Sequence, residues 1–247
     1  RRFELNPAPA GNLLTFLSRI PDPRGHQGRR HRLEAMLASV VCAMLQGARG
    51  YSAIAQWLHE QETELHHVLG FLRTPPKEGA FRKLLMALSP GHFERVLSDW
   101  MKYCLDIPTD GAPLQAAAMD GKTLCGTLEP HARAVHLLSL LDQQRGCVLS
   151  QSRVDAKTNE HKEALELLKT IVLEGRVITG DAIFCQRQEC EDACRIRKAA
   201  APQNFAALRN AIVSLLRLDG HTNIAAAMRK CSWKTQPILA MLGIFKK

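Results

Sequence analysis

The first hundred residues carry apolar side chains at the spacing of α-helices. In the clearest run, from Leu33 to Leu45, apolar positions fall three and four residues apart. This spacing places them on one broad face and predicts a mostly buried helix. Ser52 is expected to cap the next helix. The same spacing predicts helices near residues 13–19, 52–58, 81–88 and 90–100. Residues 31–107 are therefore predicted to form an all-helical module.

The pattern becomes strand-like after a polar, proline-containing stretch at residues 108–113. Strands are expected at 116–119, 136–141, 147–154 and 176–180, with a hairpin loop at 142–146 and a helix at 159–172. Two further helices, at 204–218 and 220–228, follow, and the first is expected to pack on the sheet. This order predicts an α+β protein in which the helical module precedes a mixed sheet with flanking helices.

We therefore divide the chain into four parts. They are a basic irregular arm at 1–30, the helical module at 31–107, the sheet-containing core at 114–188 and basic C-terminal helices packed on that core at 189–247. The helical module could present a helix to a DNA major groove. The alternative is that it serves only for packing or dimerisation.

The charge of the chain is concentrated near its two ends. The formal charge is +9, residues 195–247 hold ten basic residues and one acidic residue, and residues 1–32 hold seven Arg and two acids. Clustered positive charge favours a polyanion, so we expect a nucleic-acid partner. The alternative is that the basic residues only keep the protein in solution.

The eight cysteines lie mostly within apolar runs, where a thiol behaves as a small hydrophobic group, and they imply no disulfide framework. Cys185, Cys190 and Cys194 are clustered but lack the spacing of a paired zinc motif, so zinc is not expected. The sequence shows no signal peptide and no apolar run long enough to cross a bilayer. We therefore expect a protein of the reducing cytosol with no membrane partner.

Two acidic residues follow short apolar runs in the sheet region. Asp120 comes after Ala117-Ala118-Met119, and Asp181 comes after Val177-Ile178-Thr179-Gly180. Carboxylates at the ends of buried strands commonly assemble a metal-dependent phosphoryl-transfer site. Mg²⁺ accepts such oxygen ligands, and Mn²⁺ is the alternative metal. For either Asp alone, the ordinary interpretation is a turn or capping residue.

A series of short motifs, taken in order, resembles a known family. The motifs are Asp22-Pro23-Arg24, Gly28-Arg29-Arg30-His31, Ala53-Ile54-Ala55-Gln56-Trp57, Met119-Asp120-Gly121-Lys122-Thr123-Leu124, Val154-Asp155-Ala156-Lys157-Thr158-Asn159-Glu160, Thr179-Gly180-Asp181-Ala182, Arg195-Ile196-Arg197-Lys198, Leu208-Arg209-Asn210 and Gly220-His221-Thr222-Asn223. Each motif is weak alone, but their order and spacing are specific. Over most of its length the chain resembles the DDE transposases of the bacterial insertion-sequence group that includes the H-repeat-associated proteins.

This resemblance implies an RNase H-like catalytic domain in which Asp120 and Asp181 are two acids of a triad that binds Mg²⁺. It also implies a protein that binds the double-stranded ends of its element and cleaves and joins strands. We expect a homodimer or larger assembly in the bacterial cytosol, associated with the nucleoid. The candidate DNA-binding residues are Lys122, Lys157, Arg29, Arg30, Arg195, Arg197, Lys198 and Arg209.

The third acid is where the sequence departs from the family. In the family, a long segment bearing the catalytic Glu separates the second Asp from a downstream Glu-Asp pair. Here Glu191-Asp192 matches that pair and begins only ten residues after Asp181, so the core is expected to be truncated or interrupted. Glu189 or Glu191 could substitute, although so short an interval leaves little room for a supported helix. A decayed or domesticated transposase, an engineered deletion and a segment removed from the sequence would each explain the interval.

Three functions remain open at this point. The first is a transposase that cleaves and joins DNA with Mg²⁺. The second is a transposase-derived DNA-binding protein without catalysis, acting as a regulator or as a partner in an assembly. The third is a structural or dimerisation role of the helical module.

Overall fold

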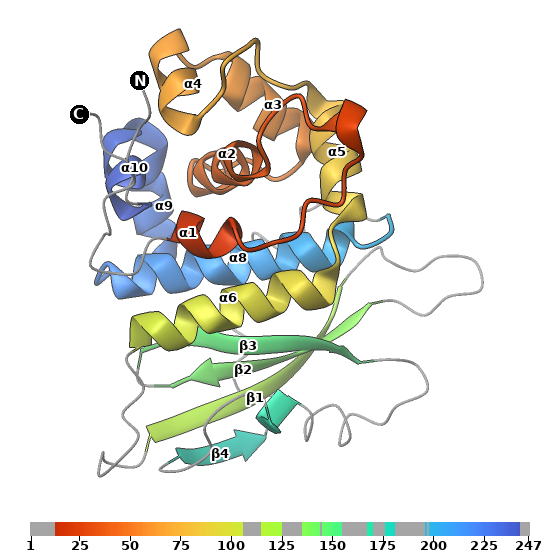
Figure 1. The fold of residues 1–247 in the computed structure, drawn as a ribbon. Helices are drawn as coiled ribbons and strands as arrows, with labels where there is room; N and C mark the ends of the chain where they lie inside the picture. The colour runs from red at the N-terminus through yellow and green to blue at the C-terminus, as the bar shows by residue number, and fades with distance from the viewer. Residues whose placement is uncertain are drawn as a thin grey trace.

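The computed structural model describes residues 13–105, 115–124, 135–143, 145–154, 167–169, 176–180, 196 and 198–242. Its helices are α1 (Leu13–Leu17), α2 (Leu33–Leu45), α3 (Tyr51–His59), α4 (Thr63–Leu69), α5 (Glu78–Ala87), α6 (Pro90–Leu105), α8 (Ala201–Leu218), α9 (Ile224–Trp233) and α10 (Gln236–Met241), with a 3-10 turn at His26–Gly28. Its strands are β1 (Gln115–Thr123), β2 (His136–Asp142), β3 (Cys147–Val154) and β4 (Arg176–Gly180). Helices lie above the sheet in Figure 1. The predicted α+β class is confirmed.

The four strands form one mixed sheet in the order β3-β2-β1-β4. β2 pairs antiparallel with both β1 and β3, the strands that precede and follow it in the chain. β4 pairs parallel with β1, and it therefore returns to the sheet by a crossover from β3. The mixed sheet predicted from the sequence is confirmed, and β1 is placed between two neighbours.

Helices α6 and α8 lie side by side and pack against β3, an edge strand of the sheet (Figure 1). Polar side chains join both helices to the backbone of β3. Ser98 of α6 donates to the Leu149 carbonyl at 3.0 Å, and Ser214 of α8 accepts from the Val148 N–H at 3.1 Å. These bonds satisfy buried polar groups, which are costly to leave unpaired. The predicted packing of the C-terminal helix on the sheet is confirmed, and a helix of the N-terminal module packs there beside it.

Helix α2 lies at the centre of the remaining helices (Figure 1). All of its residues except Glu34 are buried, which is typical of a helix surrounded by other elements. Its side chains and those of α1, α6 and α8 belong to one hydrophobic core, which also includes Ala117 of β1. The described part of the predicted arm therefore begins with a helix, α1, that is packed into this core.

Several boundaries differ from the sequence predictions. Helix α3 begins at Tyr51 after an extended Gly50, so Ser52 is not its cap. Helix α9 begins at Ile224, and Asn223 is its N-cap, with Oδ1 accepting from the Ala226 N–H at 2.9 Å. Helices α4 and α10 were not predicted. Both have fewer than eight residues, which is too short to establish a hydrophobic period.

Two sequence predictions fall largely outside the described residues. Of the helix predicted at 159–172, residues 167–169 are described, and they are helical. The predicted boundary at 108–113 is not among the described residues. Within the ranges given above, no helix combines the length and the apolar character that crossing a membrane requires. The described cysteines, Cys42, Cys104, Cys147 and Cys231, are not joined in disulfide bonds.

Substituting Gly146 by alanine is expected to destabilise the protein by about 1–2 kcal/mol, the usual cost of placing an L-residue in the left-handed region. Gly146 has φ +65° in the β2–β3 turn, and an added Cβ would lie 3.2 Å from Nε of Arg217. Gly91→Ala is the matched control because an added Cβ at this α6 position meets nothing within 4 Å. Urea unfolding would measure both variants. An unchanged midpoint for Gly146→Ala would contradict the prediction.

Candidate active site and basic surfaces

Asp120 lies on β1, opposite Ser139 of β2. Side chains alternate between the faces of a strand. Asp120 therefore shares a face of β1 with Ala118, opposite to that of Ala117 and Met119, and it is half-buried. Ser139 pairs in turn with Gln151 of β3, whose side chain bonds to α6 and α8. The strand thus holds one half-buried carboxylate within the sheet.

The parallel pairing of β1 with β4 bears directly on the second candidate acid. The described register runs from Gln115 opposite Arg176 to Met119 opposite Gly180. The next residue along β1 is Asp120, and the next residue after β4 is Asp181. Asp181 itself lies outside the described residues.

The donor chemistry of this region fits a divalent metal. Carboxylate oxygens are the ligands that Mg²⁺ and Mn²⁺ accept, and Asp120 supplies one carboxylate from the interior of a sheet. Within the described residues, no three His, Cys, Asp or Glu side chains are grouped so that they could hold a metal ion. Asp120 is therefore the described member of the candidate site.

The first of two basic surfaces lies beside the N-terminal end of α2. A hollow of about 410 Å³ is lined there by His26, Gln27, Arg29, Arg30, His31, Arg32, Gly70, Leu72 and Arg73. We call it the basic hollow. Burial lowers the pKa of His31, and the neighbouring charges of Arg30, Arg24 and Arg73 lower it further. The arginines that line the hollow give it a positive charge, which favours an anionic ligand.

A local ion pair holds the loop that forms the basic hollow. The Arg24 guanidinium donates to Asp22 at 2.8 and 2.9 Å and to the His31 carbonyl at 2.9 Å. The Arg24 side chain lowers the pKa of Asp22 by hydrogen bonding to its carboxylate. Arg29 and Arg30 are both exposed, and Arg29 is anchored to the loop because it donates to the Arg24 carbonyl at 2.7 Å. The Asp-Pro-Arg motif therefore shapes the basic surface.

The second basic surface is a groove of about 790 Å³ between the end of α2, α8 and α9. Its charged lining residues are Arg49, Arg209, Arg217 and Arg229. We call it the arginine groove. The Arg209 guanidinium lies 5.9 Å above the Phe205 ring, and Arg217 donates to the Thr222 carbonyl at 2.6 Å. These contacts fix the positions of two of the four arginines.

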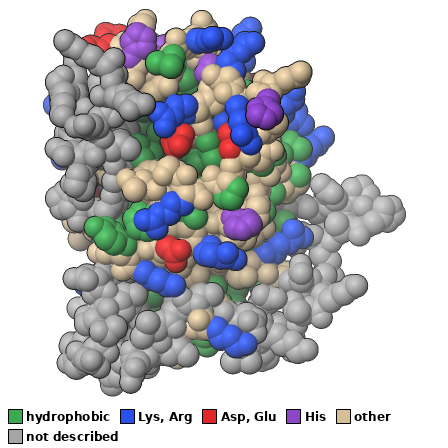
Figure 2. Space-filling model, in the orientation of Figure 1, with side chains coloured by type: hydrophobic (Ala, Val, Ile, Leu, Met, Phe, Trp, Pro, Cys, Tyr) green, Lys and Arg blue, Asp and Glu red, His purple; other side chains and the backbone are tan. Residues whose placement is uncertain are grey.

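The other candidate DNA-binding residues are placed as follows. Lys122 pairs with Leu137 in the sheet, and its side chain is not described. Lys198 is exposed just before α8. Lys157, Arg195 and Arg197 lie outside the described residues. The described candidates are therefore distributed over the basic hollow, the arginine groove and the sheet. Figure 2 shows Lys and Arg side chains over much of one face, with few Asp and Glu among them.

Sequence reasoning missed Trp233 and Glu94 as residues of interest. Trp233 belongs to a basic helical region that the charge count identified only as a whole. An exposed Trp among basic residues on a helix was an available signal. Glu94 gave no such signal, because in the sequence it looks like an ordinary solvent-facing acid of a helix.

Comparison with known proteins gives the family. Residues 14–101 match the family described as "DDE_Tnp_1-associated", and residues 112–229 match the one described as "Transposase DDE domain". The chain is 33% identical over 178 residues to "Putative transposase YncI" of Escherichia coli K12, covering 71% of this chain and 70% of that protein. The chain belongs to the DDE transposase family.

The similarity extends to relatives of the H-repeat group. "H repeat-associated putative transposase YhhI" of Escherichia coli K12 is 28% identical to this chain over 196 residues. The match covers 78% of this chain and 50% of that protein. "H repeat-associated putative transposase YbfD" of the same organism is 26% identical over 200 residues, covering 80% of this chain and 76% of that protein. The matched region thus spans about half the length of YhhI. No solved structure matches the chain. The group predicted from the motifs is confirmed.

Proposed function

We propose that this chain binds the double-stranded ends of an insertion element and cleaves and joins DNA strands by metal-dependent phosphoryl transfer. One observation carries the proposal. β1, which holds Asp120, is flanked by antiparallel β2 and by parallel β4, whose last residue directly precedes Asp181. Neighbouring parallel strands bring their carboxyl ends to one edge of a sheet. This pairing supports a site formed by the two acids.

Asp120 and Asp181 are the residues that would hold Mg²⁺ or Mn²⁺. A bound divalent cation would supply an activated nucleophile and neutralise charge on the phosphoryl group. The strands fix the direction of the Asp120 carboxylate, and a fixed anion costs little reorganisation when the reaction proceeds. Lys122, two residues further along β1, is proposed to contact phosphate oxygens.

The basic hollow is the proposed contact for the DNA backbone. Arg29, Arg30, Arg32 and Arg73 line it. Arginine presents a planar fork of donors that suits phosphate oxygens. With these positive charges, the hollow would position DNA without reading its sequence. This DNA substrate would locate the activity at the chromosome, in the bacterial cytosol, and we propose a homodimer or larger assembly there.

A second function is favoured by the short interval after Asp181. Glu191-Asp192 begins ten residues beyond it, where the family has a long segment carrying the third acid. A site with two acids would react far more slowly than a complete triad. The alternative is therefore a transposase-derived DNA-binding protein that acts as a regulator or as a partner in an assembly.

Incubation with a supercoiled plasmid bearing the ends of the encoding element tests the proposal. We expect nicking in Mg²⁺ or Mn²⁺ and none in EDTA, together with salt-sensitive binding. Each phosphate contact should contribute about 0.9 to the slope of log affinity against log salt. Tight binding without nicking in either metal would support the second function. Absence of binding even at low salt would contradict both.

A further inference from the structure

Within the described residues, the arginine groove is lined by no residue of β1, the strand that holds Asp120. Its walls come from the end of α2 and the following loop, from α8, and from α9 with the loop before it. Four arginines line it, and within the described residues no Asp or Glu does. Arginine forms bidentate bonds to phosphate, and a one-sign lining attracts a ligand of the opposite charge. The charge of the groove therefore fits a phosphate-bearing ligand.

The groove also has an apolar floor. Met44, Phe205, Ile212, Ile224 and Met228 are among its lining residues. Phosphate groups gain nothing from apolar side chains, whereas the faces of nucleic-acid bases do. In a duplex these faces are stacked on one another, and in an unpaired strand they are free to pack against protein. An apolar floor between arginines therefore matches an unpaired strand better than a duplex.

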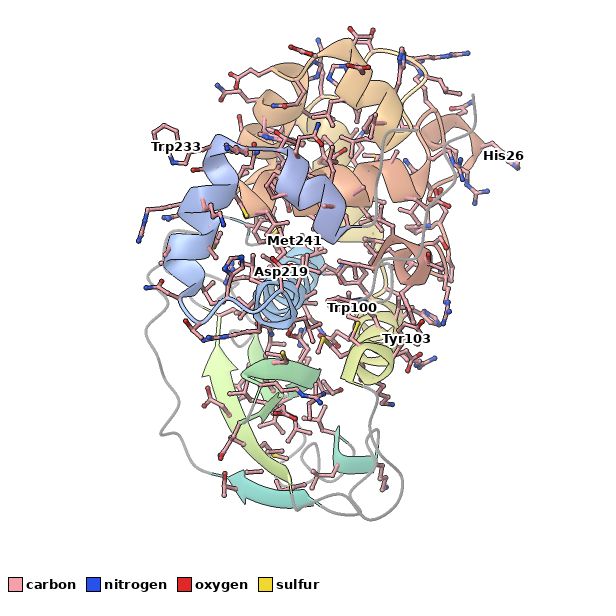
Figure 3. The ribbon with its side chains drawn as sticks, turned by 90° about the vertical axis from the view of Figure 1, so that its left-hand side faces the viewer. His26, Trp100, Tyr103, Asp219, Trp233 and Met241 are labelled. Atoms are coloured by element: carbon pink, nitrogen blue, oxygen red, sulfur yellow. The ribbon has the colours of Figure 1, made fainter. Side chains whose placement is uncertain are left out.

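An exposed aromatic side chain extends the groove. Trp233 is 85% exposed at the end of α9, and Figure 3 shows its ring pointing away from the body of the protein. Ala225 and Arg229 line the groove, and Trp233 continues their stripe because residues four apart share a helix face. Lys230 and Lys234 flank it in the sequence, and both are exposed. Aromatic rings beside a basic groove are the usual platform for unpaired bases.

We propose that the arginine groove, with Trp233 at its rim, binds single-stranded DNA. This inference rests on the proposed function, since a chain that cleaves DNA ends has an unpaired strand available to bind. Arg209 and Arg229 contact backbone phosphates, and a base stacks on Trp233. An acidic peptide would also match the arginines and the floor, but four guanidinium groups and a free indole favour phosphates and bases.

The groove and the basic hollow lie far apart on the molecule. In Figure 3, His26 of the basic hollow and Trp233 beside the groove are on opposite sides. The two surfaces are therefore separate sites. Duplex can occupy the basic hollow while an unpaired strand occupies the groove.

Fluorescence anisotropy with a labelled 25-residue oligothymidine, measured in EDTA, tests the proposal. The double variant Arg209→Gln, Arg229→Gln is expected to lower the slope of log affinity against log salt by about 1.4, or about 0.7 for each single-strand phosphate. Trp233→Ala is expected to weaken binding about 5- to 100-fold, the usual range for losing one stacked base. Oligothymidine should quench the tryptophan emission of the parent protein and leave that of Trp233→Phe less affected.

Arg95→Gln combined with Lys102→Gln on α6 is the charge-matched control, because neither residue lines the groove. The control should bind oligothymidine with the parent slope. The proposal would be overturned if the groove variants and the control had equal slopes and affinities. It would also be overturned if a polyglutamate peptide competed as effectively as unlabelled oligothymidine. This binding is measured without metal, so it tests the groove even if the protein does not nick plasmid. If the groove variants kept both nicking and oligothymidine binding, the groove proposal would be wrong and the proposed function would stand.

Discussion

Replacing Asp120 by asparagine is expected to reduce plasmid nicking roughly 1,000-fold or more, the scale of single charge-stabilising groups in phosphoryl transfer. Asparagine keeps the size of the side chain but removes the negative charge by which a carboxylate binds a divalent cation strongly. Asp120 lies within β1 and pairs with Ser139 of β2, so the variant should retain the sheet. The loss should therefore appear in the rate of cleavage and not in folding.

Asp99→Asn is the matched control for this experiment. Asp99 is an exposed α6 residue whose carboxylate lies 3.9 Å from Nζ of Lys102. Such an exposed pair contributes little to stability. We expect Asp99→Asn to nick plasmid at the parent rate and Asp120→Asn to bind element-end DNA with parent affinity. If Asp120→Asn nicked as fast as the control, Asp120 would not be a catalytic residue.

The sequence predicted those elements whose physical signal is local. Helix α2 begins and ends at the predicted residues, because its long apolar pattern is set by the chain itself. β1 extends beyond the predicted residues 116–119 to Thr123 because β2 pairs with its backbone through Asp120, Gly121 and Lys122. Strand pairing is a tertiary effect that an apolar run does not encode. The motif around Asp120 indicated the location of a site, and the sheet order shows which strands surround it.

The basic surfaces could be predicted only in part for the same reason. Arg29 and Arg30 are neighbours in the sequence, whereas only the fold brings Arg73 beside them. The arginine groove likewise combines Arg49, Arg209 and Arg229 from three distant segments. Net charge predicts a polyanionic partner, whereas the packing of α2, α8 and α9 decides where the arginines meet. The absence of a third acid remains a prediction from the sequence, because residues 181–195 are not described.

Glu94 shows most clearly what sequence patterns leave hidden. It lies on α6 but is only 9% exposed, between the sheet and α8. Its Oε1 accepts from Gln151 of β3 at 2.7 Å and from Gln203 of α8 at 3.0 Å. Asn210 of α8 extends the network by donating to Gln151 at 2.6 Å. One acid thus connects the three elements that form the main layer contact of the fold.

Replacing Glu94 by glutamine is expected to stabilise the protein by about 3 kcal/mol at pH 8.5. This value follows from the rise in the Glu94 pKa on folding, at about 1.36 kcal/mol for each pKa unit. Burial raises the pKa of Glu94 from 4.5 to about 7, although the hydrogen bonds from Gln151 and Gln203 oppose this rise. Glutamine retains an oxygen that can accept both bonds and carries no charge to bury. Glu94 lines a cavity of about 20 Å³, large enough for one water molecule that could accept from the new amide group.

The pH dependence of this difference tests the prediction. An acid whose pKa is higher in the folded protein stabilises it fully below the unfolded pKa, and this stability is lost as the pH rises through the folded pKa. The advantage of Glu94→Gln should therefore be largest at pH 8.5 and fall below about 1 kcal/mol at pH 5, where folded Glu94 is protonated. Urea unfolding of both proteins across this range measures it, and the other titrating groups largely cancel in the difference. An advantage independent of pH would mean that Glu94 does not change its protonation between pH 5 and 8.5. A destabilised variant at pH 8.5 would show that the charged carboxylate strengthens the network by more than its burial costs.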